Sequence, residues 1–221
     1  MTSHSPPFRI AAFLLLAALV VTAVAQTAAN VPADLDAKSL ARLPYLTRAD
    51  LGEAGQKLAD IFARNGKPSD PVTGPLAFAA YNAPVANALL DLHDGAVGKG
   101  SLNPHVRELA ILVACRETNY NLEWNAHEAT ALKSGVDAKL LDVIRRRGPV
   151  TGLDEQDAVV VRLGRQMFGD KKVEPATFAK IVELYSRRGA MDMVAVMNTY
   201  AVSGFYAIAV DEQPAPGKSP L

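Results

Sequence analysis

An apolar run that carries a single acid constrains the fold more than any other feature of this sequence. Residues 106–115 read VRELAILVAC, so Glu108 is surrounded along the chain by leucine, isoleucine, valine and alanine. Polar residues at 116–119 interrupt the run, and a second helical pattern begins at Asn121. Because a charged side chain in such surroundings is rarely buried without a partner, Glu108 is expected to be paired. The sequence therefore predicts an apolar helix followed at once by a second helix.

The second helix carries a carboxylate and an imidazole on one face. Glu123 and His127 are four residues apart, a spacing that brings side chains together on an α-helix. Tyr120 precedes Glu123 by three residues and lies at the helix entrance on roughly the same side. A carboxylate beside a histidine can move protons near neutral pH. Glu108, Tyr120, Glu123 and His127 are therefore the candidate catalytic residues.

Two other interpretations of these residues stay open at this stage. A glutamate four residues before a histidine is common on helices, and the three charged groups could form a buried polar network that only fixes helix packing. Glu108, Glu123 and His127 also match a metal-binding triad by residue type. The sequence spacing of a third ligand is not diagnostic, and we predict neither a metal nor another cofactor.

The rest of the chain shows helical periodicity that glycine and proline punctuate. Helices are expected over residues 48–64, 76–97 in two parts, 137–147, 154–168, 176–188 and 191–210, with Gly189 as the break between the last two. The last of them is apolar nearly all round, which predicts a central position or a subunit contact. We find no alternating strand pattern and no internal repeat, so the predicted class is all-α.

The first 25 residues have the pattern of a secretory signal peptide. Arg9 precedes an apolar segment at residues 10–21, and small residues at 23–25 form a cleavage site. The apolar segment is short for a membrane span, which needs about 20 residues, although an uncleaved N-terminal anchor is the alternative. We therefore expect an exported, periplasmic or secreted protein with an extended leader at 26–46, one helical domain at 47–212 and a disordered tail at 213–221.

Composition excludes several classes of function. The 23 basic and 23 acidic residues balance, which gives no sign of a nucleic-acid surface or of strong attraction to membranes. Cys115 is the single cysteine, so neither an intrachain disulfide nor a two-cysteine redox pair can form. Its place in the apolar run indicates a small buried hydrophobic residue. His93 and His105 lack sequence neighbours that would make a site, and both are assigned to helix ends or the surface, with a local contact between His105 and Glu108 also open.

The spacing of the candidate residues resembles a known superfamily. The AhpD-like alkylhydroperoxidases carry the pattern Glu-x11-Cys-x2-Cys-x3-His, which Glu108 and His127 match at its ends. Tyr120 and Glu123 occupy the positions of the two cysteines. With the flanking sequences RELAILVA and EWNAHEATALKSGV, this substitution is similar to the carboxymuconolactone decarboxylase branch, over residues 76–210.

The resemblance implies an orthogonal bundle of about seven to eight helices in a homotrimer or homohexamer, with the site in a small cavity near a subunit interface. It implies cofactor-free decarboxylation of a small lactone or carboxylic acid. His127 would stabilise the developing carbanion or return the proton, Glu123 and Glu108 would orient the imidazole, and Tyr120 would donate a hydrogen bond to a substrate oxygen.

Two other functions stand beside decarboxylation. The first is the reduction of hydroperoxides by a peroxiredoxin-like antioxidant protein, which needs a reactive thiolate that Tyr120 and Glu123 cannot supply. The second is a helical oligomer that binds a small hydrophobic ligand without turning it over. Each function predicts a small-molecule ligand and none requires nucleic acid.

Overall fold

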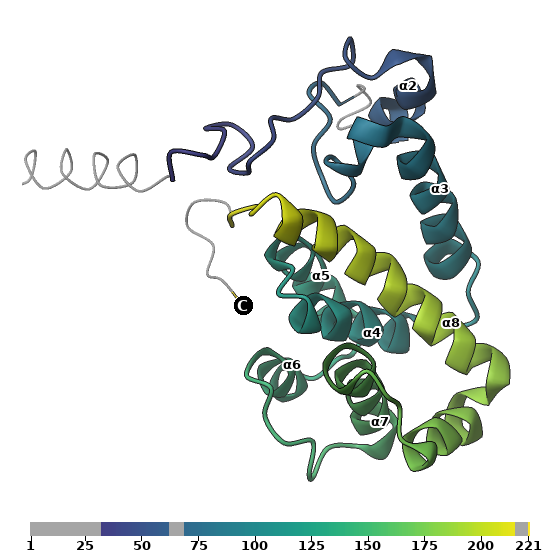
Figure 1. Ribbon diagram of the computed structural model, residues 1–221. Helices are drawn as coiled ribbons and strands as arrows, with labels where there is room; N and C mark the ends of the chain where they lie inside the picture. Colours follow the sequence, from purple (N-terminus) through teal and green to yellow (C-terminus); the bar gives the residue numbers. More distant parts are fainter. Residues whose placement is uncertain (1–31, 62–68, 215–220) are drawn as a thin grey trace, which may run out of the picture.

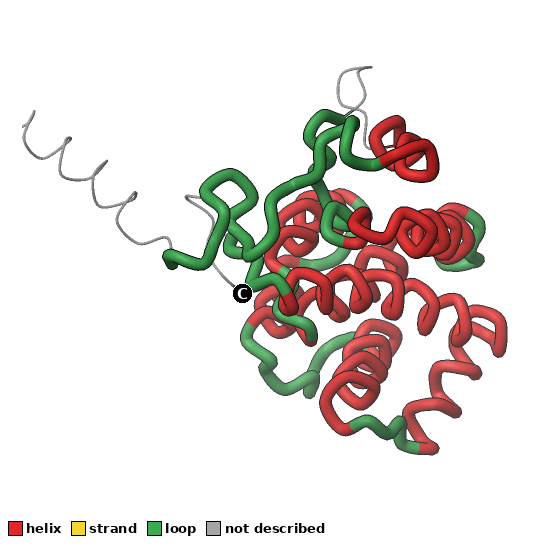
Figure 2. The backbone as a smooth tube through the Cα atoms, turned by 45° about the horizontal axis from the view of Figure 1, so that its top comes forward, coloured by secondary structure: helices red, strands yellow, loops and turns green. Residues whose placement is uncertain are grey.

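The computed structural model describes residues 32–61, 69–214 and 221, and the ordered elements within these ranges are all helical (Figure 1, Figure 2). The helices are α2 (Gly52–Ile61), α3 (Ala83–His93), α4 (Pro104–Glu117), α5 (Asn121–Lys133), α6 (Ala138–Arg145), α7 (Glu155–Arg165) and α8 (Pro175–Ala209). A 3₁₀ turn (Ala79–Asn82) precedes α3, and π-helical turns follow α3 (Asp94–Gly98) and α7 (Gln166–Asp170). No strand occurs in the described ranges, which confirms the predicted all-α class and is consistent with the predicted helical bundle.

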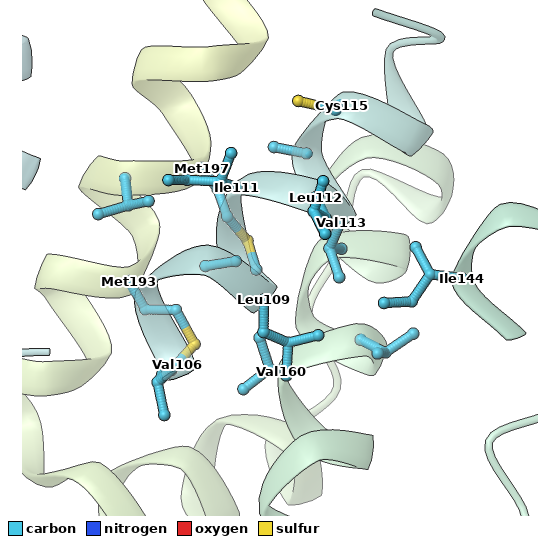
Figure 3. Close-up of a cluster of buried hydrophobic side chains, with 14 of the residues drawn as sticks. Val106, Leu109, Ile111, Leu112, Val113, Cys115, Ile144, Val160, Met193 and Met197 are labelled. Carbon is cyan, nitrogen blue, oxygen red and sulfur yellow. The ribbon is translucent and has the colours of Figure 1, made fainter. Parts of the chain in front are cut away.

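Helix α4 forms the centre of the bundle and packs against α5, α7 and α8 (Figure 1). Asn103 caps its start, because the side-chain oxygen accepts a hydrogen bond from the Val106 N–H at 3.0 Å, and Pro104 occupies the first turn. The apolar run is buried on nearly all sides. In Figure 3 the α4 side chains lie among residues of three other helices; these are Ile144 of α6, Val160 of α7, and Met193 and Met197 of α8.

Two glycines allow neighbouring helices to approach α4 and the turn after it. A Cβ atom at Gly164 of α7 would lie 2.2 Å from Cγ1 of Val113, and one at Gly204 of α8 would lie 2.7 Å from Oγ1 of Thr118. Contacts this short require the neighbouring side chain or its helix to move, and close packing leaves little room for either. Gly204 therefore lets α8 pack closely on the α4–α5 turn, one helical turn from Tyr200.

The break in the last helical segment lies at a different residue from the predicted one. We expected Gly189 to separate two helices, but the non-helical residue is Ser186, with φ 66° and ψ 170°. The Ser186 hydroxyl accepts a hydrogen bond from the Gly189 N–H at 3.3 Å, so the serine caps the second half of α8. Gly189 is helical and buried, and a Cβ there would lie 3.1 Å from Cβ of Tyr185.

The first predicted helix also differs from the observed one. We expected residues 48–64, whereas α2 begins at Gly52 and residues 62–64 lie outside the described ranges. The Thr47 N–H and hydroxyl both donate to the Asp50 carboxylate, at 2.9 and 2.6 Å, which closes a turn at residues 47–50. Gly52 has φ +60°, so a helix cannot run through it from that turn.

Residues 32–46 of the predicted leader contain no helix and pack beside the end of α8. The Arg42 N–H donates to the Val210 carbonyl at 2.7 Å, and the Gln213 N–H donates to the Leu40 carbonyl at 2.9 Å. The rings of Tyr45 and Phe78 stack with centroids 5.5 Å apart. The predicted signal peptide and residues 215–220 of the predicted tail lie outside the described residues. None of the described helices has the length and apolar character needed to span a bilayer.

Candidate functional site

A short turn folds α5 back onto α4 and brings the predicted acids and the histidine together. Asn119 adopts a left-handed conformation with φ 51°, which asparagine tolerates better than most residues. The Tyr120 N–H then donates to the Cys115 carbonyl at 2.7 Å and closes the end of α4. Glu108 lies in the middle of α4 and faces the first turns of α5, which carry Glu123 and His127.

The imidazole of His127 lies between two carboxylates. Its Nδ1 is 2.8 Å from Oε2 of Glu108, and its Nε2 is 3.3 Å from Oε2 of Glu123. The side chains of Glu108 and Glu123 are only 6% and 8% exposed, whereas that of His127 is 21% exposed. Buried carboxylates need a charged or hydrogen-bonding partner, and His127 is such a partner for both Glu108 and Glu123. The structure therefore places three of the four predicted site residues in direct contact.

Tyr200 of α8 is a fourth member of this network that the sequence analysis missed. Its hydroxyl is 3.1 Å from Nε2 of His127, and the two rings meet edge to face with centroids 5.1 Å apart. Tyr200 lies in the last predicted helix, at residues 191–210, which was interpreted as apolar nearly all round. Its hydroxyl was the available signal, because a buried tyrosine usually requires a hydrogen-bond partner. That partner could not be identified from a position 73 residues away.

The structure does not bring the fourth predicted residue, Tyr120, into the network. Its hydroxyl donates to the Pro75 carbonyl at 3.3 Å, and burial raises the pKa of Tyr120 well above its usual value. The ring is 3% exposed and belongs to the hydrophobic core. Tyr120 therefore links the start of α5 to the loop before α3.

Electrostatics favour a charged His127. Burial alone would lower its pKa, but the hydrogen bonds and charges of Glu108 and Glu123 outweigh burial and raise the pKa of His127 to about 9. The imidazole is therefore an imidazolium at neutral pH, with both ring N–H groups donating. Burial, together with the charge of Glu123, raises the pKa of Tyr200, which keeps its hydroxyl protonated.

This shift predicts a loss of stability at alkaline pH. The pKa of His127 is about 9 in the folded chain and 6.5 in the unfolded one, so its contribution is complete below pH 6.5 and disappears as the pH rises through 9. We expect the free energy of unfolding to fall by about 2–3 kcal/mol between pH 7 and pH 9.5. Urea unfolding at the two values measures this, and His127→Gln should show a much smaller fall. An equal fall in the variant would contradict the assignment.

A cavity of about 120 Å³ lies beside the network. It is bounded mainly by residues of α3 and α8, with Glu123 from α5, and its walls are largely apolar. The lining residues are Ile61, Pro75, Leu76, Leu89, Leu90, Leu92, His93, Glu123, Thr199, Tyr200 and Ser203. Glu123 and Tyr200 are the two members of the network that line the cavity. His127 does not line it but contacts both of these side chains. A ligand in the cavity would therefore meet Glu123 and Tyr200 before His127.

The other two described histidines have different surroundings. His93 is the exposed last residue of α3, in agreement with its predicted place at a helix end or on the surface. It also lines the cavity, with its ring centroid 6.2 Å from that of Tyr200. Nε2 of His105 is 2.7 Å from Oδ1 of Asp157, so His105 links α4 to α7 and does not contact Glu108. Proximity to the cavity could not be read from the sequence, because it depends on how α3 packs against α8.

Cys115 is fully buried in the core, as predicted. Burial raises the pKa of its thiol well above the usual value, so the thiolate is strongly disfavoured.

The carboxylates of the network do not converge on a common point. Each ring nitrogen of His127 faces a different carboxylate, so the imidazole occupies the place between them that a cation would need. Among the described residues, no group of three or more His, Cys, Asp or Glu side chains is arranged to hold a metal ion.

Comparison with known proteins supports the predicted resemblance. Residues 83–160 match the model of the Carboxymuconolactone decarboxylase family. The matched segment runs from the start of α3 into α7 and includes Glu108, Glu123 and His127. It is shorter than the segment at 76–210 over which the resemblance was predicted, and it leaves out α8 with Tyr200. No curated protein matches the chain.

Proposed function

We propose that this protein catalyses cofactor-free decarboxylation of a small lactone or carboxylic acid by acid–base chemistry. One observation carries the proposal. Glu123 and Tyr200 line one small cavity, and both lie within contact distance of Nε2 of a charged His127. The match to the carboxymuconolactone decarboxylase family supports the same class of chemistry.

The hydroxyl of Tyr200 is suited to stabilise the negative charge that develops in decarboxylation. As the carbon–carbon bond to the carboxylate breaks, its electron pair stays on the substrate and delocalises onto a neighbouring carbonyl oxygen. The Tyr200 O–H donates to that oxygen, while the Tyr200 oxygen accepts from the Nε2–H of His127 at 3.1 Å. A preorganised hydrogen-bond donor stabilises the charge that develops in the transition state, and a neighbouring cation such as the His127 imidazolium strengthens that donor. The activation barrier falls most where the site excludes water.

Glu123 and Glu108 maintain this arrangement. Glu108 holds the Nδ1–H of His127 at 2.8 Å and fixes the orientation of the ring. The carboxylate of Glu123 lies 3.3 Å from the other ring nitrogen, Nε2, and also presents negative charge to the cavity. Because like charges repel, a substrate carboxylate would turn away from Glu123. His127 and Glu108 are thus positioning residues, and Tyr200 and Glu123 face the substrate.

The size of the cavity limits the substrate. An engineered cavity of about 150 Å³ in another protein holds one benzene molecule. The cavity of about 120 Å³ therefore suits a single five- or six-membered ring with few substituents. Its aliphatic walls favour an uncharged ring body.

Hydroperoxide reduction has less support. The reaction requires a thiolate nucleophile and a second thiol to resolve it. Cys115 is the single cysteine; it is fully buried and does not line the cavity.

The proposal is tested by supplying small carboxylated lactones to the purified protein. The first is 2-oxotetrahydrofuran-3-carboxylate, in which the ring carbon that bears the carboxylate adjoins the ring carbonyl. In D₂O we expect carbon dioxide to be released faster than the spontaneous rate. We also expect one deuteron to be incorporated at the ring carbon that carried the carboxylate, and NMR follows both changes. Binding of these lactones without faster release of carbon dioxide would overturn the proposal in favour of a non-catalytic ligand-binding protein.

A further inference from the structure

We propose that His93 is a further catalytic residue of this site, which binds the substrate carboxylate and then protonates the carbon from which carbon dioxide has left. This inference rests on the proposed function and names the group that supplies the proton.

His93 is placed to touch a ligand. It is the last residue of α3 and lines the same cavity as Glu123 of α5 and Tyr200 of α8. Its ring is tilted by 54° to that of Tyr200, with centroids 6.2 Å apart. Within the described part of the chain, His93 makes no hydrogen bond, whereas the rings of His105 and His127 are both held by carboxylates. Its ring nitrogens are therefore available to a bound molecule.

The charges around the cavity select His93 as the partner of an anion. Among the described lining residues, Glu123 is the acid and His93 is the side chain that can become a cation; the others are aliphatic, hydroxyl-bearing or proline. The imidazolium of His127 does not line the cavity, and its N–H groups already face Glu108, Glu123 and Tyr200. A substrate carboxylate repelled by Glu123 would therefore pair with His93.

The state of His93 depends on whether an anion is bound. Partial removal of water lowers the pKa of His93, the negative charges of Glu123 and Asp94 oppose this effect, and the charge of His127 adds to it. The ring of Tyr200, with its centroid 6.2 Å from that of His93, is uncharged. A carboxylate within about 4–6 Å favours the imidazolium. Binding of an anionic substrate should therefore draw one proton from solvent onto His93.

This proton completes the reaction. Decarboxylation of a carboxylate consumes one proton for each carbon dioxide released. The carbon–carbon bond breaks, the electron pair stays on the ring carbon and its carbonyl, and carbon dioxide departs. The imidazolium that held the carboxylate then adjoins that carbon. Its N–H bond breaks as the new C–H bond forms, and the neutral imidazole is ready for the next substrate.

Chemical modification tests the placement of His93 without any measurement of turnover. Diethyl pyrocarbonate acylates accessible neutral imidazoles, and the modified residues are mapped by mass spectrometry. At pH 7 we expect His93 to react and His127 to remain unmodified. 2-Oxotetrahydrofuran-3-carboxylate should protect His93 at concentrations at which neutral γ-butyrolactone protects it much less. His105 serves as the internal control and should react equally with and without either compound. Unchanged modification of His93 in the presence of the carboxylated lactone would overturn the proposal.

Calorimetry on His93→Gln tests the charge. Glutamine keeps a hydrogen-bonding group but cannot become a cation. We expect the variant to bind 2-oxotetrahydrofuran-3-carboxylate roughly 10- to 100-fold more weakly and γ-butyrolactone with unchanged affinity. In buffers of different ionisation enthalpy, the wild-type protein should take up a proton on binding and the variant should not. His105→Gln is the matched control and should behave as wild type.

The outcomes separate the two proposals. Proton uptake and protection at His93 without any release of carbon dioxide would refute decarboxylation and retain the anion-binding role of His93. Release of carbon dioxide at the wild-type rate by His93→Gln would refute the role of His93 and retain decarboxylation. Failure of the wild-type protein to bind the carboxylated lactone at all would overturn both.

Discussion

His127→Ala is expected to lower the free energy of unfolding by about 3–5 kcal/mol at pH 7. The substitution leaves the carboxylates of Glu108 and Glu123 facing an empty space, and both are more than nine-tenths buried. A buried charge that loses its partner retains the cost of desolvation; Glu108 keeps an ion pair with Nε of Arg107 at 3.7 Å, so the larger part of this cost falls on Glu123. Urea unfolding monitored by circular dichroism measures the change.

His105→Ala is the matched control for this variant. His105 also pairs with a carboxylate, that of Asp157 at 2.7 Å, but its side chain is 29% exposed and that of Asp157 is 18% exposed. We expect its loss to cost about 1 kcal/mol or less. The double variant Glu108→Gln/His127→Ala should be more stable than the sum of the two single changes predicts, because one of the two buried carboxylate charges is removed. A cost for His127→Ala no larger than that for His105→Ala would show that the network contributes little.

Tyr200→Phe is expected to reduce kcat for decarboxylation by about 100- to 1,000-fold, the usual effect of removing one donor to a developing oxyanion. KM should change little, because the ring that forms the cavity wall remains. The variant also loses the 3.1 Å contact with Nε2 of His127, which should cost about 1 kcal/mol of stability. The substrate found by the release of carbon dioxide provides the assay.

Tyr185→Phe separates this effect from the general loss of a tyrosine hydroxyl. Tyr185 also lies on α8, and its hydroxyl donates to the Gln156 carbonyl at 3.0 Å, away from the cavity. We expect its kcat to equal that of the wild-type protein. If Tyr200→Phe retains full activity, the oxyanion must be stabilised by another group and the role assigned to Tyr200 is wrong.

Local pattern was sufficient for much of the fold. The periodicity of α4 and α5 located both helices, and the isolated Glu108 in an apolar run correctly predicted a paired acid. The break in α8 was misplaced because glycine was taken as the disruptive residue, whereas Ser186 caps a new helical segment and Gly189 is needed for close packing. The start of α2 was misplaced for a related reason, since the side chain of Asp50 favours a turn over a helix there.

The sequence by itself determined that the chain is helical and that Glu123 and His127 are neighbours, because helical periodicity and four-residue spacing are local properties of the backbone. Only the tertiary structure decided which side chains meet around the cavity. Tyr200 reaches His127 because α8 packs closely on the α4–α5 turn, and His93 enters the same cavity because α3 ends beside α8. Tyr120 points to Pro75 for the same reason, since contacts between helices, and not spacing along one helix, fix where a side chain at a helix end can find its partner.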